Sequence, residues 1–112
     1  MRLLIPPADC PGVYLIQDGD LYKIGFASHI RSRVSQIRCG KGRGTRAYPS
    51  AILHSWLPLP DRWLRAVENR LHDRLSGREA WERSWEWFTL SARAVRLVQV
   101  EMIRAARWIE EL

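Results

Sequence analysis

Residues 12–26 read GVYLIQDGDLYKIGF, and this stretch decides the fold. Residues 12–16 and 21–26 are rich in β-branched and aromatic side chains, which favour strands. Between the two runs lies Asp18-Gly19-Asp20, a composition typical of a tight turn. Two such runs joined by a turn signal predict a β-hairpin.

The length of the turn sets the faces of the two hairpin tyrosines. A two-residue loop at Asp18-Gly19 places Tyr14 opposite Lys23, whereas a three-residue loop through Asp20 places Tyr14 and Tyr22 on the same face. Strand tyrosines are ordinarily good β-formers with no further role. Only the longer loop gives a tyrosine pair, and the sequence leaves both loops open.

An amphipathic helix is predicted directly after the hairpin. Ser28 is a suitable N-cap, and Gly40 is a suitable stop. The apolar positions recur at helical spacing: Ile30, Val34 and Ile37. Residues 41–46 then form a predicted exposed basic loop with no apolar anchor.

The remaining chain adds further strands and helices to the hairpin. Residues 51–57 read as a third strand between prolines, so the prediction is a three-stranded sheet. Asp61 caps a predicted helix over 62–75 that ends before Gly77. A further strand is predicted over residues 85–90. The fold class is therefore α+β, in a single domain spanning 1–112 with its core over about 11–91.

A long helix over about 92–111, capped by Ser91, closes the chain. It carries an apolar stripe with alternating spacings of three and four: Val95, Val98, Met102, Ala105, Ile109 and Leu112. An apolar helix face of this kind must be buried against another surface. Burial against the domain's own sheet is the favoured interpretation, and a homodimer through this helix is the alternative.

Composition and net charge indicate a folded domain that binds a negatively charged partner. The chain has 112 residues, of which 46% are apolar, including six tryptophans, as expected for one folded domain. Lys and Arg outnumber Asp and Glu by 18 to 12, and the net charge of +6 favours a polyanion. The first residues resemble neither a signal peptide nor a spanning helix, and two cysteines fit reduced thiols. We therefore expect a cytoplasmic protein that does not enter a membrane.

Glu68 is the most unusual carboxylate in the sequence. It lies inside the apolar stripe of its predicted helix, between Leu64 and Leu71, where an unpaired charge is costly. His72 follows one turn later and is a candidate partner. Two interpretations are open at this point, a structural pair of Glu68 with His72 or an arginine, and a ligand for Mg²⁺.

Basic residues supply candidate contacts to phosphate. Arg33 borders the apolar stripe of the first helix, and a guanidinium can clamp a phosphate with two donors. An arginine in such a place is more often a surface residue whose stem covers apolar atoms. The other predicted nucleic-acid contacts are Lys23, Arg31, Arg38, Lys41, Arg43 and Arg46.

The motifs Gly12-Val13-Tyr14 and Tyr22-Lys23-Ile24-Gly25 resemble the two halves of the motif that names the GIY-YIG nuclease superfamily. Their order along the chain strengthens the resemblance, because Arg33, then Glu68 to His72, then Glu86-Trp87-Phe88 follow. This series is similar to the small phage- and prophage-associated branch of that superfamily. The position one turn after Arg33, a histidine in many members, is Ile37 here.

The resemblance implies a three-stranded antiparallel sheet flanked by helices and a metal-dependent endonuclease. Tyr14 would be the general base, and Tyr22 would order the water or the phosphate. Arg33 would hold the scissile phosphate, and Glu68 would hold one Mg²⁺ or Mn²⁺ ion. His72 would support Glu68 or contact the phosphate.

The expected partner is DNA, with RNA not excluded. The competing hypothesis is a non-catalytic DNA-binding or regulatory module with the same fold and basic surface.

Overall fold

A computed structural model of the chain describes residues 9–40, 46–75, 80–84 and 87–110. The strands are β1 (Gly12–Asp18), β2 (Leu21–Ala27), β3 (Ile52–Pro58), β4 (Ala80–Ser84) and β5 (Trp87–Leu90). The helices are α1 (Ile30–Cys39), α2 (Leu64–Leu75), which follows a 3-10 turn at Asp61–Trp63, and α3 (Ala92–Glu110). The α+β class predicted from the sequence is confirmed.

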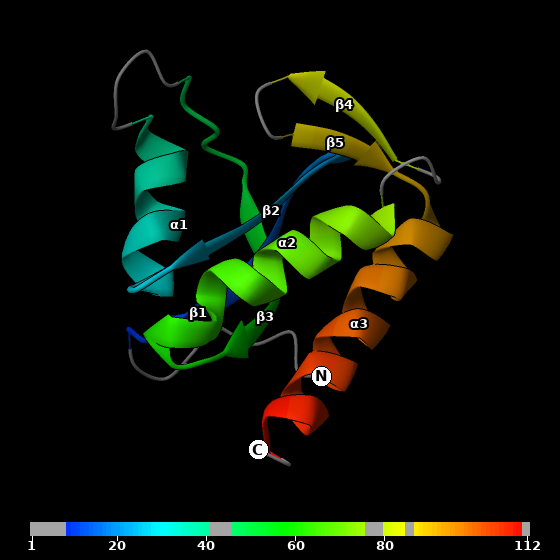
Figure 1. Cartoon of the computed structure of the whole chain (residues 1–112). Coiled ribbons are helices and arrows are strands. Elements are labelled where there is room, and N and C mark those ends of the chain that lie inside the picture. Colours follow the sequence, from blue (N-terminus) through cyan, green and yellow to red (C-terminus); the bar gives the residue numbers. More distant parts are fainter. Residues whose placement is uncertain (1–8, 41–45, 76–79, 85–86, 111–112) are drawn as a thin grey trace.

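The described strands form one antiparallel sheet in the order β3-β1-β2-β5-β4 (Figure 1). The predicted hairpin is β1 and β2, and the predicted third strand pairs with the other edge of β1. The strand predicted over 85–90 is β5, which begins at Trp87; residues 85 and 86 lie outside the described residues. Strand β4 was not predicted, and it extends the sheet beyond β5.

The sheet separates two apolar clusters because alternate strand residues point to opposite faces. On one face Tyr14 and Ile16 pack against α1. On the other face Val13, Leu15 and Ile24 pack against α2 and α3. Figure 1 shows α1 on one side of the sheet and the other two helices on the opposite side.

Helix α1 is capped differently from the prediction. It begins at Ile30, and Ser28 is not its cap. Asp9, which precedes β1, supplies the cap: its Oδ1 accepts hydrogen bonds from the backbone N–H groups of Arg31 at 2.8 Å and Ser32 at 3.4 Å. The Ser32 hydroxyl donates to Asp9 Oδ2 at 2.5 Å. The cap therefore comes from a distant segment, which local spacing does not reveal.

Asp61 also has a different role from the predicted one. It belongs to the 3-10 turn before α2, where its side chain makes no capping hydrogen bond. The side chain instead accepts a hydrogen bond from the Ser28 hydroxyl at 3.1 Å. The start of α2 is therefore tied to the end of β2. The predicted helix end at Gly77 lies outside the described residues.

Two other predicted helix boundaries are confirmed. Gly40 ends α1 in a left-handed conformation with φ of 70°. At the start of α3, the Ser91 hydroxyl accepts a hydrogen bond from the Ala94 N–H at 3.1 Å.

The apolar stripe of α3 is buried inside the domain, as favoured from the sequence. Val95, Val98, Met102 and Ala105 belong to the core cluster, and Ile109 packs against it. Leu112 lies outside the described residues. The stripe is therefore not available as the predicted homodimer seam. No helix in the described part of the chain has the length and hydropathy to cross a bilayer.

Candidate nucleic-acid site at the edge of β2

Strand β2 has a strand neighbour along only half of its outer edge. Strand β5 pairs with Leu21, Tyr22 and Lys23 and goes no further. The following segment, Ile24–Ala27, pairs with β1 on one side and has no strand partner among the described residues on the other. We call this segment the β2 edge. Polar backbone groups at such an edge need other partners.

The observed register settles which tyrosine faces which helix. Asp18 pairs with Leu21, so the turn has two residues, Gly19-Asp20 instead of Asp18-Gly19. Tyr14 is therefore opposite Gly25, and Tyr22 is opposite Gln17. Paired residues share a face, so the two tyrosines lie on opposite faces of the sheet. The tyrosine pair that the longer loop would give does not form.

Tyr14 reaches across β2 over a glycine. Its side chain is only 1% exposed. A Cβ atom added to Gly25 would lie 2.5 Å from the Tyr14 hydroxyl and 2.7 Å from its Cζ. The phenol therefore occupies the space that any other residue at position 25 would fill, and its hydroxyl lies beside the backbone of the β2 edge.

Lys23, not Tyr22, shares the face of Tyr14. Lys23 lies two residues before Gly25 on the same strand, and alternate strand residues point the same way. In the second half of the resembled motif, Lys23 is also the residue directly before Ile24-Gly25. The geometry thus places an amine where the second tyrosine was expected.

Tyr22 lies in a polar group on the α3 side of the sheet. Its hydroxyl accepts a hydrogen bond from Gln17 Nε2 at 3.0 Å, and its ring meets that of His54 edge-on at 6.1 Å. Burial lowers the pKa of His54, which favours the neutral ring. Tyr22 is therefore remote from the face that Tyr14 and Arg33 share.

Arg33 lies on the flank of α1 that faces the β2 edge. Arg31 and Arg38 line a hollow with Leu53 of β3, and Arg38 Nε donates to the Ala51 carbonyl at 2.7 Å. With about 100° of rotation per residue, Arg33 lies on the opposite flank of α1 from Arg31 and Arg38. Because β2 lies on the other side of β1 from β3, this flank faces β2. Its side chain is exposed and makes no hydrogen bond or ion pair with the described residues.

The position of Arg33 along α1 also matches the β2 edge. The last turn of α1 lies near β5, because the Tyr48 N–H donates to the Ile37 carbonyl and the Tyr48 ring stacks on Trp87 at 4.4 Å. The first turns of α1, which hold Arg33, are at the other end. Figure 1 shows this end of α1 beside the end of β2.

His72 of α2 occupies the β2 edge from the other face. Its Nε2 lies 3.3 Å from the Ile24 carbonyl oxygen, which can only accept, so Nε2 carries the proton in this contact. The His72 ring also packs against Phe88 of β5, with centroids 5.6 Å apart. His72 thus satisfies a backbone group where the ladder between β2 and β5 stops.

Glu68 is half-buried on the same flank of α2 as His72, one turn nearer the helix start. The opposite flank faces α3, where Arg70 and Arg74 pair with Glu101. Because Ser28 and Asp61 join the end of β2 to the start of α2, Glu68 lies farther toward Ala27 than His72 does. Glu68 and Arg33 therefore approach the β2 edge from opposite faces.

The basic residues predicted to contact nucleic acid lie in different parts of the structure. Lys23 is at the site, whereas Arg31 and Arg38 lie on the β3 flank of α1. Arg46 is exposed, with its guanidinium 5.6 Å from the Tyr48 ring centroid. Lys41 and Arg43 lie outside the described residues.

Sequence reasoning missed a second unusual carboxylate. Glu101 is 1% exposed and lies in the stripe of α3 between Val98 and Met102. The criterion that singled out Glu68, a charge inside an apolar stripe, would have found it. Its partners, Arg70, Arg74 and Arg104, come from two helices.

The hairpin with Tyr14 over Gly25, flanked by one helix that carries Arg33 and another that carries Glu68, defines a small α+β domain with polar side chains around one strand edge. A family model described as the T5orf172 domain matches residues 12–109. The chain belongs to this phage-associated, nuclease-related family. Neither a curated protein nor a solved structure gives a significant match to the chain.

Proposed function

We propose that the protein is a metal-dependent endonuclease of the GIY-YIG type that hydrolyses phosphodiester bonds in DNA. The observation that supports the proposal is Tyr14 packed over Gly25 at the β2 edge, with Arg33 on α1 and Glu68 on α2 placed by helical spacing on the flanks that face this edge. Membership of a nuclease-related family and the net charge of +6 support a nucleic-acid substrate.

Tyr14 is the proposed general base. A phenol with an ordinary pKa near 10 is largely protonated at neutral pH, so a base role needs positive charge nearby. Lys23 on the same face and Arg33 on the flank of α1 supply such charge. The phenolate takes a proton from water, the water oxygen bonds to phosphorus, and the bond from phosphorus to the leaving sugar oxygen breaks. The leaving oxygen takes a proton from solvent to become a hydroxyl.

Arg33 is the proposed phosphate ligand. Its exposed guanidinium is uncommitted within the described residues, and it can donate two hydrogen bonds to the charge that develops on the phosphate. Arg38, by contrast, already donates to the Ala51 carbonyl. The guanidinium of Arg33 is therefore better placed to bind a phosphate than that of Arg38, although both residues belong to α1.

Glu68 is the proposed ligand for one Mg²⁺ or Mn²⁺. The described residues contain no group of three or more His, Cys, Asp or Glu side chains suited to a metal ion. A single carboxylate fits an ion that takes most of its ligands from water and substrate phosphate. When bound, the ion would supply positive charge at the leaving oxygen.

The test is cleavage of plasmid and single-stranded DNA in Mg²⁺ or Mn²⁺ by wild type, Glu68→Gln and Arg33→Gln. Each variant is expected to lose about 100-fold or more in rate, because each removes a group that stabilises transition-state charge. Arg31→Gln is the matched control, since it removes the same charge from the other flank of α1. Equal losses for Arg31→Gln and Arg33→Gln would sink the assignment of Arg33.

The second candidate function is a DNA-binding module without cleavage. Two observations favour it: Lys23 stands where the second tyrosine was expected, and Ile37, at the position of a histidine in many members of the superfamily, is buried in the core. Salt-sensitive DNA binding with intact DNA in every metal-containing lane is the result that would select this function.

A further inference from the structure

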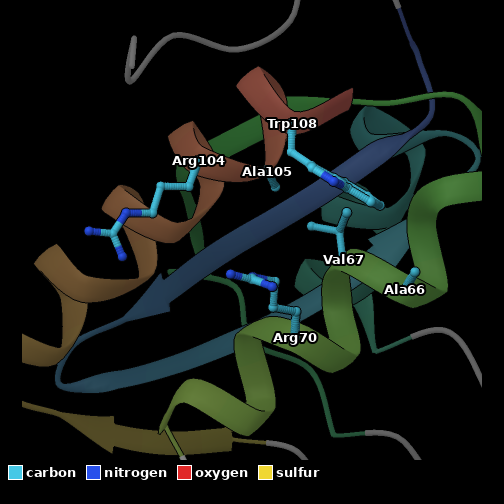
Figure 2. Close-up of a pocket in the computed structure, with 6 residues that line it drawn as sticks. All are labelled: Ala66, Val67, Arg70, Arg104, Ala105 and Trp108. Carbon is cyan, nitrogen blue, oxygen red and sulfur yellow. The ribbon is translucent and has the colours of Figure 1, made fainter. Parts of the chain in front are cut away.

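A cavity of about 280 Å³ opens between α2 and α3, on the flank of α2 that faces away from the β2 edge. Figure 2 shows the residues that line it: Ala66, Val67, Arg70, Arg104, Ala105 and Trp108. The cavity combines an apolar floor, an indole wall and two guanidinium groups. None of these residues belongs to the proposed cleavage site.

The guanidinium groups are held by a buried carboxylate. Glu101 accepts a hydrogen bond from Arg104 Nη1 at 3.0 Å and one from Arg70 Nε at 3.4 Å, while Arg74 Nε lies 3.8 Å away. The arginine side chains are 63%, 53% and 46% exposed in that order, and that of Glu101 is 1% exposed. Three cations on one anion leave an excess of two positive charges at the surface. This cluster is fixed in place and suited to an anion.

The indole wall is unusually open to solvent. Trp108 is 51% exposed, although large aromatic side chains are mostly covered in folded proteins. Its ring meets Trp63 edge-on at 5.3 Å, which supports it from one side. Figure 2 shows the indole beside Val67, with the side chains of Arg70 and Arg104 pointing away from the indole.

We propose that this cavity binds one nucleotide of a single-stranded nucleic acid. The base would stack on Trp108 above the apolar floor, and the adjoining phosphate would contact Arg70 and Arg104. An unpaired base offers a free π-face to an aromatic side chain, whereas a base in a duplex is already stacked. The choice of a nucleic acid over another polyanion rests on the proposed function.

Helix α2 connects this cavity to the proposed cleavage site. Glu68 and His72 lie on one flank of α2, and Arg70 and Ala66 lie on the other. A strand held in the cavity therefore needs to cross only the width of one helix, about 10 Å, to reach the β2 edge. The substrate class is accordingly DNA with a single-stranded segment beside the bond that is cut.

The test is anisotropy of a labelled oligo-dT titrated with full-length protein in EDTA, where metal-dependent cleavage does not occur. Trp108→Ala is expected to weaken binding about tenfold, while Trp108→Phe keeps most of the affinity because a ring remains. Binding of an abasic oligomer of the same length, and of a duplex, is expected to be unchanged by Trp108→Ala. Melting curves establish that each variant is folded.

Arg104→Gln and Arg107→Gln form a matched pair on the last turns of α3. Both remove one exposed positive charge, but only Arg104 lines the cavity. Arg104→Gln is expected to weaken oligo-dT binding several-fold more than Arg107→Gln does. Equal effects of the two variants would contradict a phosphate contact in the cavity.

Three results would overturn the proposal: wild-type affinity for oligo-dT in folded Trp108→Ala, an equal loss of affinity for the abasic oligomer, or stronger Trp108-dependent binding of a poly-glutamate peptide. Failure of the proposed nuclease is a separate result. Loss of all cleavage with Trp108-dependent oligo-dT binding would remove the nuclease and keep this site. DNA cleavage by the wild type, with oligo-dT affinity unchanged in Trp108→Ala, would support the nuclease and reject the nucleotide site in the cavity.

Discussion

Replacing Gly25 by alanine tests the geometry of the proposed base. The added methyl would lie 2.5 Å from the Tyr14 hydroxyl and 2.7 Å from its Cζ, so the phenol must retreat by about an ångström. Tyr14 is 1% exposed and packed in the cluster beneath α1, so it has little room to move. Overpacking of this kind costs about 2 kcal/mol, equivalent to roughly 5–10 °C in melting temperature.

Two measurements separate overpacking from a general defect. At a temperature where the Gly25→Ala variant is fully folded, the DNA cleavage rate is expected to fall at least about tenfold, because the proposed base, Tyr14, is displaced. In a Tyr14→Phe background the same alanine should cost less stability, since the nearest atom is gone. A Gly25→Ala variant that melts like wild type and cuts DNA at the wild-type rate would refute the close packing of Tyr14 on Gly25.

Three further changes test the supports of the fold. The hydrogen bond from Ser32 holds the pKa of Asp9 below its ordinary value in the folded protein. The stability that ionised Asp9 contributes is therefore complete above the pKa of Asp9 in the unfolded chain. It is lost as the pH falls through the lower pKa of Asp9 in the folded protein. The difference in melting temperature between wild type and Asp9→Asn should therefore vanish in acid; a difference that grows there would contradict the cap. Glu101→Gln is expected to lower the free energy of unfolding by about 2 kcal/mol in urea titrations, because three arginines lose their anion; no change would show that the cluster is not stabilising. Ser91→Ala should cost about 1 kcal/mol by the same titration, and an unaltered midpoint would exclude a capping role.

Local patterns were sufficient to predict most of the elements. The hairpin, the stop at Gly40 and the cap at Ser91 depend on neighbours in sequence, and all three are confirmed. The stripe of α3 was assigned to the domain's own core, which is also confirmed. These features need only turn chemistry, capping and helical periodicity.

The features that were not predicted depend on contacts between distant segments. Asp9 caps α1 across the whole hairpin, and Asp61 binds Ser28 instead of capping α2. The sequence Asp18-Gly19-Asp20 suits more than one loop length, so it left the face of Tyr22 open. A shift of one residue in the turn moves all side chains of a strand to the opposite face of the sheet. In the observed register, Lys23 instead of Tyr22 shares the face of Tyr14.

The short pairing of β5 with β2 has a consequence for solubility. Beyond Lys23 the backbone of β2 has no strand partner among the described residues, and such an edge is a template for pairing with another molecule. His72 blocks that template by taking the Ile24 carbonyl. The edge at which we propose that a substrate binds is thus also an edge that favours self-association. Substitutions of His72 are therefore expected to increase aggregation, and any such variant that is tested for DNA cleavage must first be shown to remain monodisperse.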